Sequence, residues 1–415
     1  MVYDISGLTE LSSALSLCCL DSAQLLRVSD YKYNNVPSVG PSSSDHLFRP
    51  TSRKHKPSRT STLFNMSIPE TYKAFRRTTG DFPRTIVPTT EQMPRELGPH
   101  DVLLKIHAVS LNYRDPWMLH GGYPSHMIDR GISCSDAAAE VAAIGSAVQD
   151  LAVGDRVSVI IDLSNLTGYE DEPPHVLGGD VEGVLREYAV FEDKYLVHLP
   201  KHLSWEEAST ITVAGVTAWT ALDGLQSANS RRSVLLQGTG GVSLFALLLC
   251  LAAGIRPIIT SSSDKKLERI RQLGSHIGTI NYKTVADQAA EVQRLTDGKG
   301  VDIVINNTGV GSIPEDISFL RQRGGIVSLV GFLAGNKADW EPSAVLGLMY
   351  KFAKLKGILG GSKQDFIDLN RFLEEKKVSL APLVDRVFAF DEAPAAFDYL
   401  YSGSHVGKVV IKVQD

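Results

Sequence analysis

The sequence predicts an α/β protein in which a strand-rich region precedes a doubly wound parallel sheet. Between about residues 72 and 200 most patterns are typical of strands, such as the β-former-rich segment 102–111. From about residue 204, short apolar strands alternate with helices, which is typical of a parallel sheet covered on both faces. A glycine-rich loop joins the first of these later strands to the helix that follows it.

The separate elements follow from apolar periodicity and from turn residues. In the strand-rich region, residues 151–159 predict a turn that leads into a strand, and the polar, Gly/Pro-rich segment 162–183 predicts a loop. A helix is expected to begin at Trp205 with Ser204 as its N-cap. In the second region the sequence predicts helices over 242–253 and 264–273, and strands over 233–237, 257–260, 301–305, 325–330 and 355–359.

Composition excludes several classes of protein. The chain has 415 residues, of which 43% are hydrophobic and 21% charged, so most of it is expected to fold into a globular core. The net charge of -5 argues against nucleic acid as a partner. No apolar run reaches the roughly 20 residues that span a bilayer, so no membrane association is expected. The chain has four cysteines, Cys18, Cys19, Cys134 and Cys250, which are too few for disulfides to stabilise a chain of this length. Such sparse cysteine usage indicates a reducing, cytoplasmic location.

Residues 1–65 differ in composition from the rest of the chain. Ser, Asn and Pro cluster over 34–44, and a basic stretch follows over 49–59. Such a segment buries too little apolar surface to offset the entropy of ordering it. Two interpretations stay open: a disordered extension, or a start codon assigned too early, with Met66 as the natural start.

The glycine loop 238–243 predicts a dinucleotide site, because it lies between a strand and a helix. Gly238 permits the tight turn, and Gly240 lets the backbone approach a pyrophosphate at the N-terminus of the helix. Ser243 takes the third glycine position and is small enough for close packing of helix against strand. The residues expected to bind the cofactor here are Gly238, Gly240, Gly241 and Val242.

The end of the second strand favours NADP(H) over NAD(H). A site for NAD places an acidic residue there to bind the ribose 2′-hydroxyl. Here the segment 260–266 has hydroxyl side chains and two lysines, which suit a 2′-phosphate. Asp264 is the exception, and it is also well placed to cap the following helix.

Five separated motifs resemble those of the medium-chain dehydrogenases/reductases. They lie in the order expected for a GroES-like barrel, a Rossmann domain and a return to the barrel: 108–115, 153–157, 214–219, 238–242 and 402–410. The sequence is most similar to the zinc-independent, quinone-oxidoreductase-like members often labelled zinc-type alcohol dehydrogenase-like. The resemblance implies a GroES-like β-barrel catalytic domain over 66–213 and 362–415, a Rossmann domain over 214–361, and a homodimer.

The resemblance also implies that zinc is absent. Zinc-containing alcohol dehydrogenases hold the catalytic metal with a Cys, a His and a second Cys, and these positions correspond here to Asn112, Ser135 and Val213. The four-cysteine lobe that binds structural zinc is replaced by the loop 162–183. Cys134 is next to the position of the lost His, but one thiolate cannot make a site with three or four ligands.

Further site residues are carried over from the resemblance. Asn112 and Thr217 correspond to residues beside the nicotinamide, and Tyr113 and Tyr123 are either donors to a developing oxyanion or barrel-packing residues. Arg114 and Asp115 are expected to pair and brace the loop. His107 is expected to pack in the barrel. His120 and His126 flank the active-site loop and are either proton relays or surface residues; with no partner evident in the sequence, the surface interpretation is favoured. The other expected cofactor contacts are Ser262, Lys266 and Tyr282 at the 2′-phosphate, Lys408 at the pyrophosphate, and Asn307 at the carboxyl edge of the sheet.

These residues predict hydride transfer from NADPH to a small, electron-poor acceptor. Without a Lewis acid an alcohol is a difficult substrate, whereas quinones, enones and other conjugated carbonyls accept hydride readily. Two alternatives stay open. The first alternative to this prediction is a zinc-independent NADP-linked alcohol dehydrogenase or carbonyl reductase. The second alternative is a binding protein that holds NADPH without turnover.

Overall fold

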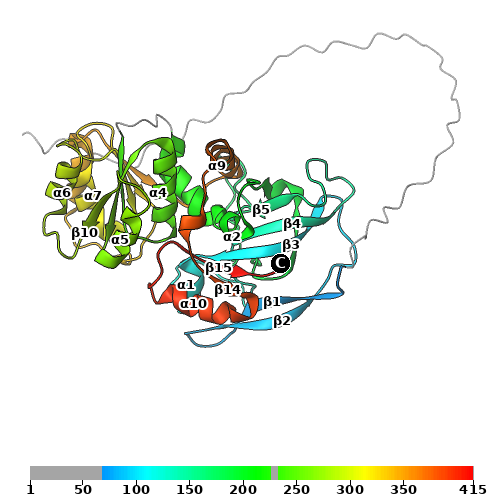
Figure 1. Ribbon diagram of the computed structural model, residues 1–415. Helices are drawn as coiled ribbons and strands as arrows, with labels where there is room; N and C mark the ends of the chain where they lie inside the picture. The colour runs from blue at the N-terminus through cyan, green and yellow to red at the C-terminus, as the bar shows by residue number, and fades with distance from the viewer. Residues whose placement is uncertain (1–67, 226–231, 415) are drawn as a thin grey trace, which may run out of the picture. The chain divides into compact units, whose positions relative to one another are not determined.

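The computed structural model describes residues 68–225 and 232–414, so the extension predicted over 1–65 lies outside it. The described residues form one sheet of seven strands, one of six and a separate hairpin (Figure 1). The two large sheets agree with the expected strand-rich region and doubly wound region. Among residues 68–225 and 232–414, no helix is long and apolar enough to cross a membrane.

The seven-stranded sheet combines the strand-rich region with the C-terminal segment. Its order is β14-β15-β3-β4-β5-β7, and β6 also pairs with β3. Strand β15 runs antiparallel to β3 with Val409 opposite Leu111. This register brings Asn112 and Lys408 together across nearly 300 residues of sequence. The strands are β3 (Asp101–Leu111), β4 (Asp136–Ile144), β5 (Arg156–Val159), β6 (Tyr188–Glu192), β7 (Leu196–His198), β14 (Val384–Ala389) and β15 (Lys408–Lys412), with the hairpin β1 (Thr71–Arg77) and β2 (Ile86–Gln92).

The six-stranded sheet is parallel throughout, with the order β10-β9-β8-β11-β12-β13. The order reverses between β8 and β11, and ligands of open α/β sheets bind at the carboxyl ends of the strands at such a point. Five of the strands were expected, whereas β10, with the short sequence GTIN, was not. The strands are β8 (Ser233–Leu236), β9 (Arg256–Ser261), β10 (Gly278–Asn281), β11 (Ile303–Asn306), β12 (Ile326–Leu329) and β13 (Lys354–Gly357).

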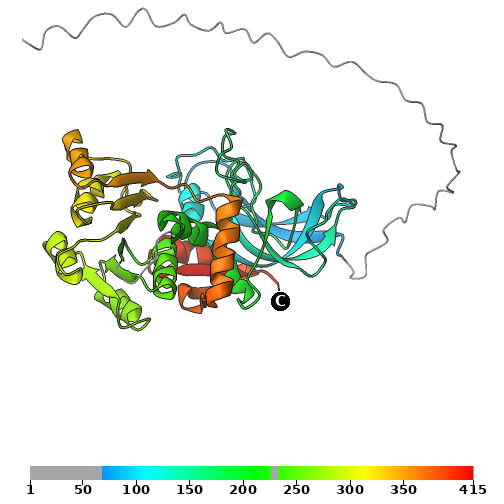
Figure 2. The same ribbon diagram turned by 90° about the horizontal axis from the view of Figure 1, so that it is seen from above.

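Helices cover both faces of this sheet (Figure 2). Val234 and Leu236 of β8 face the core that includes helices α4 and α5, whereas Leu235 faces the core that includes α6 and α7. Strands buried on both faces therefore have no polar alternation, as the sequence indicates. The helices are α1 (Arg114–Leu119), α2 (Trp205–Ala208), α3 (Val216–Ala221), α4 (Gly241–Ala253), α5 (Asp264–Arg271), α6 (Gln288–Leu295), α7 (Ile313–Phe319), α8 (Leu346–Tyr350), α9 (Lys363–Lys376) and α10 (Ala393–Tyr401).

Helix ends confirm one expected cap and correct another. The Ser204 side chain accepts the N–H of Glu207, and Glu207 bonds back to Ser204, which completes a capping box at α2. Ser263, not Asp264, caps α5, because its hydroxyl accepts the N–H of Lys266 at 3.4 Å. Asp264 instead accepts a bond from Asn281 on β10 at 2.9 Å.

Candidate active site

The glycine loop leaves open space at the start of α4. Gly240 is the N-cap residue of α4, and no side chain caps the helix there. A Cβ built on Gly240 would meet nothing within 4 Å. Gly238 has a φ of +77°, which few residues other than glycine adopt readily. At Gly240, therefore, neither a capping side chain nor a neighbouring atom obstructs the start of this 13-residue helix, which is what phosphate binding at a helix N-terminus requires.

Ser243 and Asn307 stabilise this loop through hydrogen bonds to the backbone carbonyl of Gln237, which precedes it. The Ser243 hydroxyl donates to the carbonyl of Gln237 at 2.7 Å. The Asn307 amide donates to the Ser243 hydroxyl at 3.0 Å and to the same Gln237 carbonyl at 3.2 Å. Asn307 therefore lies at the carboxyl edge of the sheet, as expected, but its amide N–H groups are used to hold the glycine loop rather than presented to a cofactor.

Three residues expected at a 2′-phosphate lie near the carboxyl ends of β9 and β10. Ser262 is exposed, and Tyr282, 47% exposed, donates its backbone N–H to the carbonyl of Ser261. Lys266 donates to the carbonyls of Gly403 and His405 at 2.7 and 2.9 Å, and partial burial lowers its pKa. Two of its three ammonium donors are thus occupied, which leaves one for a ligand.

Lys408 is not placed where a pyrophosphate contact would require it. Its side chain is 2% exposed, and its ammonium donates to the Leu111 carbonyl at 2.7 Å and to Asn112 Oδ1 at 2.6 Å. The third contact, to Asp136 Oδ2, is 3.4 Å long. All three donors of the ammonium are occupied on the barrel side of the site, so the predicted role at the pyrophosphate is not supported.

The residues at the zinc-ligand positions do not form a zinc site. Asn112 accepts from Lys408, and the Ser135 hydroxyl donates to Asp136 at 3.0 Å. Val213, in the π-helical turn before α3, offers no donor atom. Across the described ranges, no group of three or more His, Cys, Asp or Glu side chains is arranged to hold a metal ion. This set lacks the sulfur and nitrogen ligands that zinc requires.

Several buried polar atoms in this region have no partner. They are Asn112 Nδ2, Arg114 Nε and Asp115 Oδ1. Asp115 is fully buried, which raises the pKa of its carboxyl to about 6, and its other oxygen accepts the N–H of Asn112 at 2.7 Å. Arg114 donates to the carbonyl of Leu177, and no ion pair joins it to Asp115 among the described residues, so the expected direct pair is corrected. Unpartnered polar atoms that are buried call for a partner outside the protein chain, either a ligand or an ordered water.

Aromatic side chains line one border of the site. Trp117 of α1 lies 5.8 Å from Tyr113, 6.2 Å from Tyr123 and 5.1 Å from Phe332, measured between ring centroids. Phe332 follows β12, so these rings join the barrel to the Rossmann sheet. Tyr113 is 36% exposed, and partial burial raises the pKa of its hydroxyl. Thr217 is buried in α3.

The histidines fill the structural roles expected of them. His107 is buried and stacks on Trp205 with 4.2 Å between ring centroids, which confirms that it packs in the barrel. His120 stacks on Tyr401 at 3.8 Å, and its Nδ1 lies 2.9 Å from the Pro116 carbonyl. His126 is exposed.

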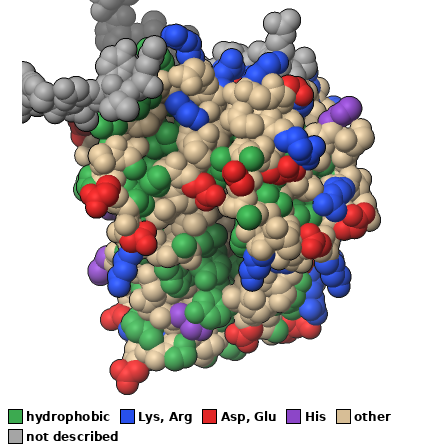
Figure 3. All heavy atoms as spheres, turned by 90° about the vertical axis from the view of Figure 1, so that its left-hand side faces the viewer, with side chains coloured by type: hydrophobic (Ala, Val, Ile, Leu, Met, Phe, Trp, Pro, Cys, Tyr) green, Lys and Arg blue, Asp and Glu red, His purple; other side chains and the backbone are tan. Residues whose placement is uncertain are grey.

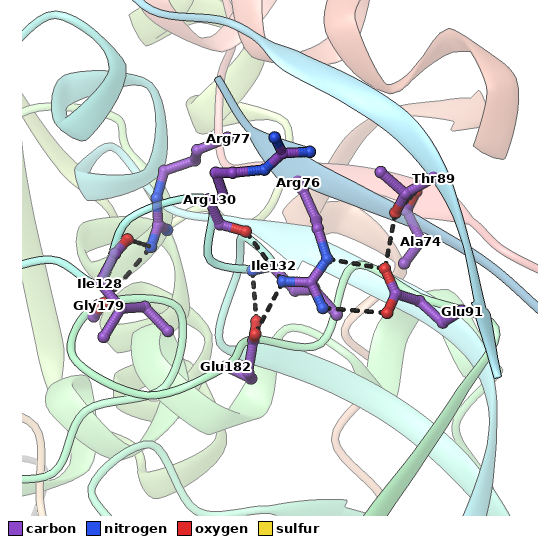
Figure 4. A network of polar contacts seen from close by, with 10 residues as sticks. All are labelled: Ala74, Arg76, Arg77, Thr89, Glu91, Ile128, Arg130, Ile132, Gly179 and Glu182. Carbon is purple, nitrogen blue, oxygen red and sulfur yellow. Dashed lines mark hydrogen bonds and ion pairs between the residues drawn. The ribbon is translucent and has the colours of Figure 1, made fainter. Parts of the chain in front are cut away.

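Arg76 on β1 connects strand β2 with Glu182, and Glu182 in turn holds the backbone of Ile132. Its guanidinium donates to Glu91 of β2 at 2.7 and 3.1 Å and to Glu182 at 2.8 Å (Figure 4). Glu182 also accepts the N–H of Ile132 at 2.6 Å. The β1–β2 hairpin is thereby tied to the segments that contain Ile132 and Glu182. These contacts were not predicted, because surface arginines and glutamates give no signal of their partners in a single sequence.

Arg77 is a second arginine whose structural role was not predicted from the sequence. Its guanidinium is almost fully buried and donates to the carbonyls of Gly178 at 2.6 Å and Ile128 at 3.2 Å (Figure 4 shows the latter bond). Cys134 lies against this loop, because a Cβ on Gly178 would come within 2.7 Å of the Cys134 carbonyl oxygen. Burial raises the pKa of the Cys134 thiol well above its usual value, so the thiol stays protonated. Cys134 is therefore a packing residue.

The buried carboxyl of Asp316, close to the loops at the carboxyl edge of the Rossmann sheet, was also not predicted from the sequence. Asp316 accepts bonds from Asn306 and Gln237, both at 2.6 Å, and from Ser312 at 3.0 Å. Burial raises its pKa to about 7. The network links the ends of β8 and β11 to α7 and so supports the loops at the carboxyl edge. The sequence signal was the pair Asn306–Asn307, where an acidic or apolar pattern is usual.

One face of the molecule is hollowed at its centre. Figure 3 shows hydrophobic side chains gathered in this hollow, with lysine, arginine and acidic side chains around it. A hollow of this kind accommodates an uncharged organic group better than a polyanion.

Comparison with known proteins identifies the class. Residues 98–201 match the family model described as "Alcohol dehydrogenase GroES-like domain", and residues 241–375 match that of "Zinc-binding dehydrogenase". Together with the two sheets and the glycine loop, these matches show that the chain belongs to the medium-chain dehydrogenase/reductase superfamily. The chain is thus an oxidoreductase of this class.

Individual relatives within the superfamily carry the names of different enzymes. A zinc-type alcohol dehydrogenase-like protein of Schizosaccharomyces pombe is 37% identical over 335 residues, which cover 79% of this chain and 94% of that protein. A quinone oxidoreductase of Pseudomonas aeruginosa is 31% identical over 260 residues, covering 62% of this chain and 72% of that one. The solved structure of an NAD-dependent alcohol dehydrogenase is 28% identical, with a TM-score of 0.70, and covers 82% of this chain and all of that one.

Proposed function

We propose that the protein is an NADPH-dependent oxidoreductase that transfers hydride, without zinc, to an activated acceptor such as a quinone, an enone or another conjugated carbonyl. One observation carries this proposal. At the zinc-ligand positions, Asn112 bonds to Lys408, Ser135 bonds to Asp136 and Val213 has no donor atom, while a Cβ on Gly240 of the glycine loop would meet nothing within 4 Å.

The preference for NADPH is supported by the side chains near the ends of β9 and β10. The exposed Ser262 and Tyr282 offer hydroxyl groups, and Lys266 keeps one ammonium donor free. Asp264, the one acidic side chain in the segment 260–266, already accepts a bond from Asn281 at one carboxylate oxygen. Gly238, Gly240, Gly241 and Val242 would hold the pyrophosphate at the start of α4.

The chemistry follows from what the barrel side offers in place of a metal. NADPH, when bound, supplies a hydride from C4 of its nicotinamide. The protein would hold the acceptor beside the nicotinamide and stabilise the charge that develops on its oxygen with neutral donors. The candidates for these donors are Asn112, Tyr113, Tyr123 and Thr217, and Trp117 with Phe332 would exclude water from one side.

Anaerobic stopped-flow measurement of NADPH oxidation tests the proposal. Protein with bound NADPH is mixed with 1,4-benzoquinone and, in separate experiments, with an enone and with an unconjugated aldehyde. In the reverse direction, protein with bound NADP⁺ is mixed with an alcohol and the formation of NADPH is followed. Faster oxidation by the quinone or enone is expected. Turnover of only the aldehyde or alcohol would support the carbonyl reductase alternative. No oxidation by any acceptor would support a binding protein without turnover. Metal analysis finding about one zinc per chain would contradict a zinc-free site.

A homodimer is proposed from the free edge of the Rossmann sheet. Strand β13 is the last strand of that sheet, and no described strand pairs with its outer edge. Large apolar side chains near this edge are exposed: Met349 by 62%, Phe352 by 62% and Leu355 by 40%. An exposed apolar patch beside an open edge favours pairing with a second copy. Sedimentation at micromolar concentration would reveal a single species of two chains.

A further inference from the structure

Lys408 holds the amide of Asn112 in one orientation. An ammonium group has three donors and no acceptor, so only the oxygen of the Asn112 amide can face it. The Asn112 Oδ1 atom lies 2.6 Å from the ammonium nitrogen, which fixes the Nδ2 end on the opposite side of the amide. Rotation of the amide would place two donors against each other, at the cost of a buried, charge-assisted bond.

The Nδ2 end of that amide is buried and has no partner. Its exposed surface is below 1 Å², and no acceptor lies within hydrogen-bonding distance. Buried donors in native proteins are nearly always paired, so this donor requires a partner from outside the protein chain, which is an ordered water when no ligand is bound. The fixed orientation means that this partner must be an acceptor, such as a carbonyl oxygen.

The pair lies directly beside the cofactor loop. Gly240 and Gly407 form an isolated β-bridge, and the residue after each of them begins α4 or β15. A Cβ on Gly241 would come within 2.6 Å of the Lys408 Cδ atom, so the lysine stem runs along the N-terminus of α4. The Asn112 donor is therefore at the junction of the barrel and the proposed cofactor site.

Lys408 also balances the charge of a buried carboxylate. Asp136 is fully buried, accepts the Ser135 hydroxyl on one oxygen and lies 3.4 Å from the ammonium on the other. The three groups form a linear chain from carboxylate to ammonium to amide. Polarisation along such a chain strengthens the last donor, here the Asn112 N–H.

We propose that Lys408 is a positioning residue that presents the Asn112 Nδ2 donor to the oxygen of the acceptor. The acceptor carbon gains the hydride from the reduced nicotinamide, which becomes oxidised, and an electron pair of the conjugated system moves to that oxygen. The oxygen bonds to the Asn112 N–H while it is charged and afterwards takes one proton from solvent. This inference rests on the proposed function and assigns, within it, which donor meets the developing charge.

The test compares three variants with the wild-type protein. Asn112→Ala removes the donor. Lys408→Met combined with Asp136→Asn removes the ammonium without leaving a buried charge unpaired. The third variant carries all three substitutions. Lys73→Met combined with Asp391→Asn is the matched control, since it removes an exposed lysine–aspartate pair at the same distance of 3.4 Å.

Single-turnover oxidation of bound NADPH by 1,4-benzoquinone gives the first result. Asn112→Ala is expected to slow this step about 100-fold, which is typical of the loss of one oxyanion donor. The Lys408/Asp136 variant should be slowed comparably, and the triple variant should be no slower than Asn112→Ala alone, because the two changes remove one interaction. The NADPH dissociation constant should stay within twofold. Additive losses, or unchanged rates in the folded Lys408/Asp136 variant, would overturn the inference.

Infrared spectroscopy supplies a readout that needs no turnover. Cyclohexanone is bound with NADP⁺ as a dead-end complex, and its C=O stretch is expected at lower frequency than in the Asn112→Ala and Lys408/Asp136 variants. If no acceptor is reduced by the wild-type protein but this shift is present, the proposed function fails and the positioning role stands. If acceptors are reduced but the shift is the same in all proteins, the positioning role fails and the proposed function stands.

Discussion

Substitutions at three glycines can separate cofactor binding from folding, and Gly240 provides the sharpest test. A methyl group at Gly240 meets no atom within 4 Å, and the residue has a φ of −81°, which alanine adopts without strain. Alanine is a poorer N-cap than glycine but reduces the freedom of the unfolded chain, and these opposing effects are each about 0.5–1 kcal/mol. Gly240→Ala should therefore leave the free energy of unfolding nearly unchanged.

The same methyl group should weaken the binding of NADPH. It occupies the space through which the backbone of α4 would approach the pyrophosphate. Each hydrogen bond to a charged group contributes about 1.5–3 kcal/mol, so the loss of one corresponds to roughly 10- to 150-fold weaker binding. Gly240→Val should abolish measurable binding, since it fills more of that space.

Gly238 and Gly254 form a matched pair, in which Gly254 is the control. Gly238 and Gly254 both have a positive φ, of +77° and +71°, and a Cβ on either meets nothing within 4 Å. Alanine at each should cost about 1–2 kcal/mol of stability for the left-handed conformation. Only Gly238 lies in the cofactor loop, so Gly254→Ala should retain full affinity for NADPH.

Titration of NADPH fluorescence and urea unfolding of the same preparations measure both quantities. The expected pattern is lost affinity with retained stability for Gly240→Ala, and the reverse for Gly254→Ala. If Gly240→Ala binds NADPH within twofold of the wild-type affinity, the loop is only a turn and the cofactor lies elsewhere.

Three further predictions concern other parts of the molecule. Lys266→Ala should weaken NADPH binding by about 1.5–3 kcal/mol and leave NADH binding nearly unchanged, as measured by dissociation constants; an equal loss for both would mean that Lys266 only ties down its carbonyl partners. Burial raises the pKa of Asp316 from 3.8 to about 7, so the folded state binds this proton more tightly, and the stability it contributes is present below pH 3.8 and lost as the pH rises through 7. Asp316→Asn should therefore remove up to about 4 kcal/mol of pH dependence in urea unfolding between pH 4 and 8, and parallel curves for the two proteins would contradict this. Leu355→Glu on β13 should shift sedimentation from two chains to one without changing the rate of NADPH oxidation per folded chain, whereas an unchanged dimer would place the interface elsewhere.

The fold was predictable because its signals are local. Apolar strands buried on both faces, the glycine loop and the capping residue Ser204 each depend on a few neighbouring residues. Strand β10 escaped because its four residues, GTIN, are only half apolar and gain their partners from β9. The N-cap of α5 was assigned one residue too late because Ser263 and Asp264 are both good caps.

The site was less predictable because its side chains act at long range in sequence. Lys408 was expected at a pyrophosphate, but the pairing of β15 with β3 turns its ammonium to Asn112 and Asp136 instead. The amide of Asn307 was expected to face the cofactor, and it bonds to Ser243 within the loop. Both residues lie in the expected region, and only their partners differ, since partners are set by tertiary packing.

The position of Lys408 links the glycine loop of the Rossmann domain to the Asn112 amide of the barrel, so a substitution in one part should affect the other. Its stem passes so close to Gly241 that no side chain fits between α4 and β15, while its ammonium holds the Asn112 amide. A substitution at Gly241 would therefore displace the lysine before it touched any cofactor. In a zinc-containing relative the metal would supply the fixed positive charge of the barrel. In the proposed zinc-free site, the ammonium of Lys408 would supply that charge, and its stem packs against the cofactor loop.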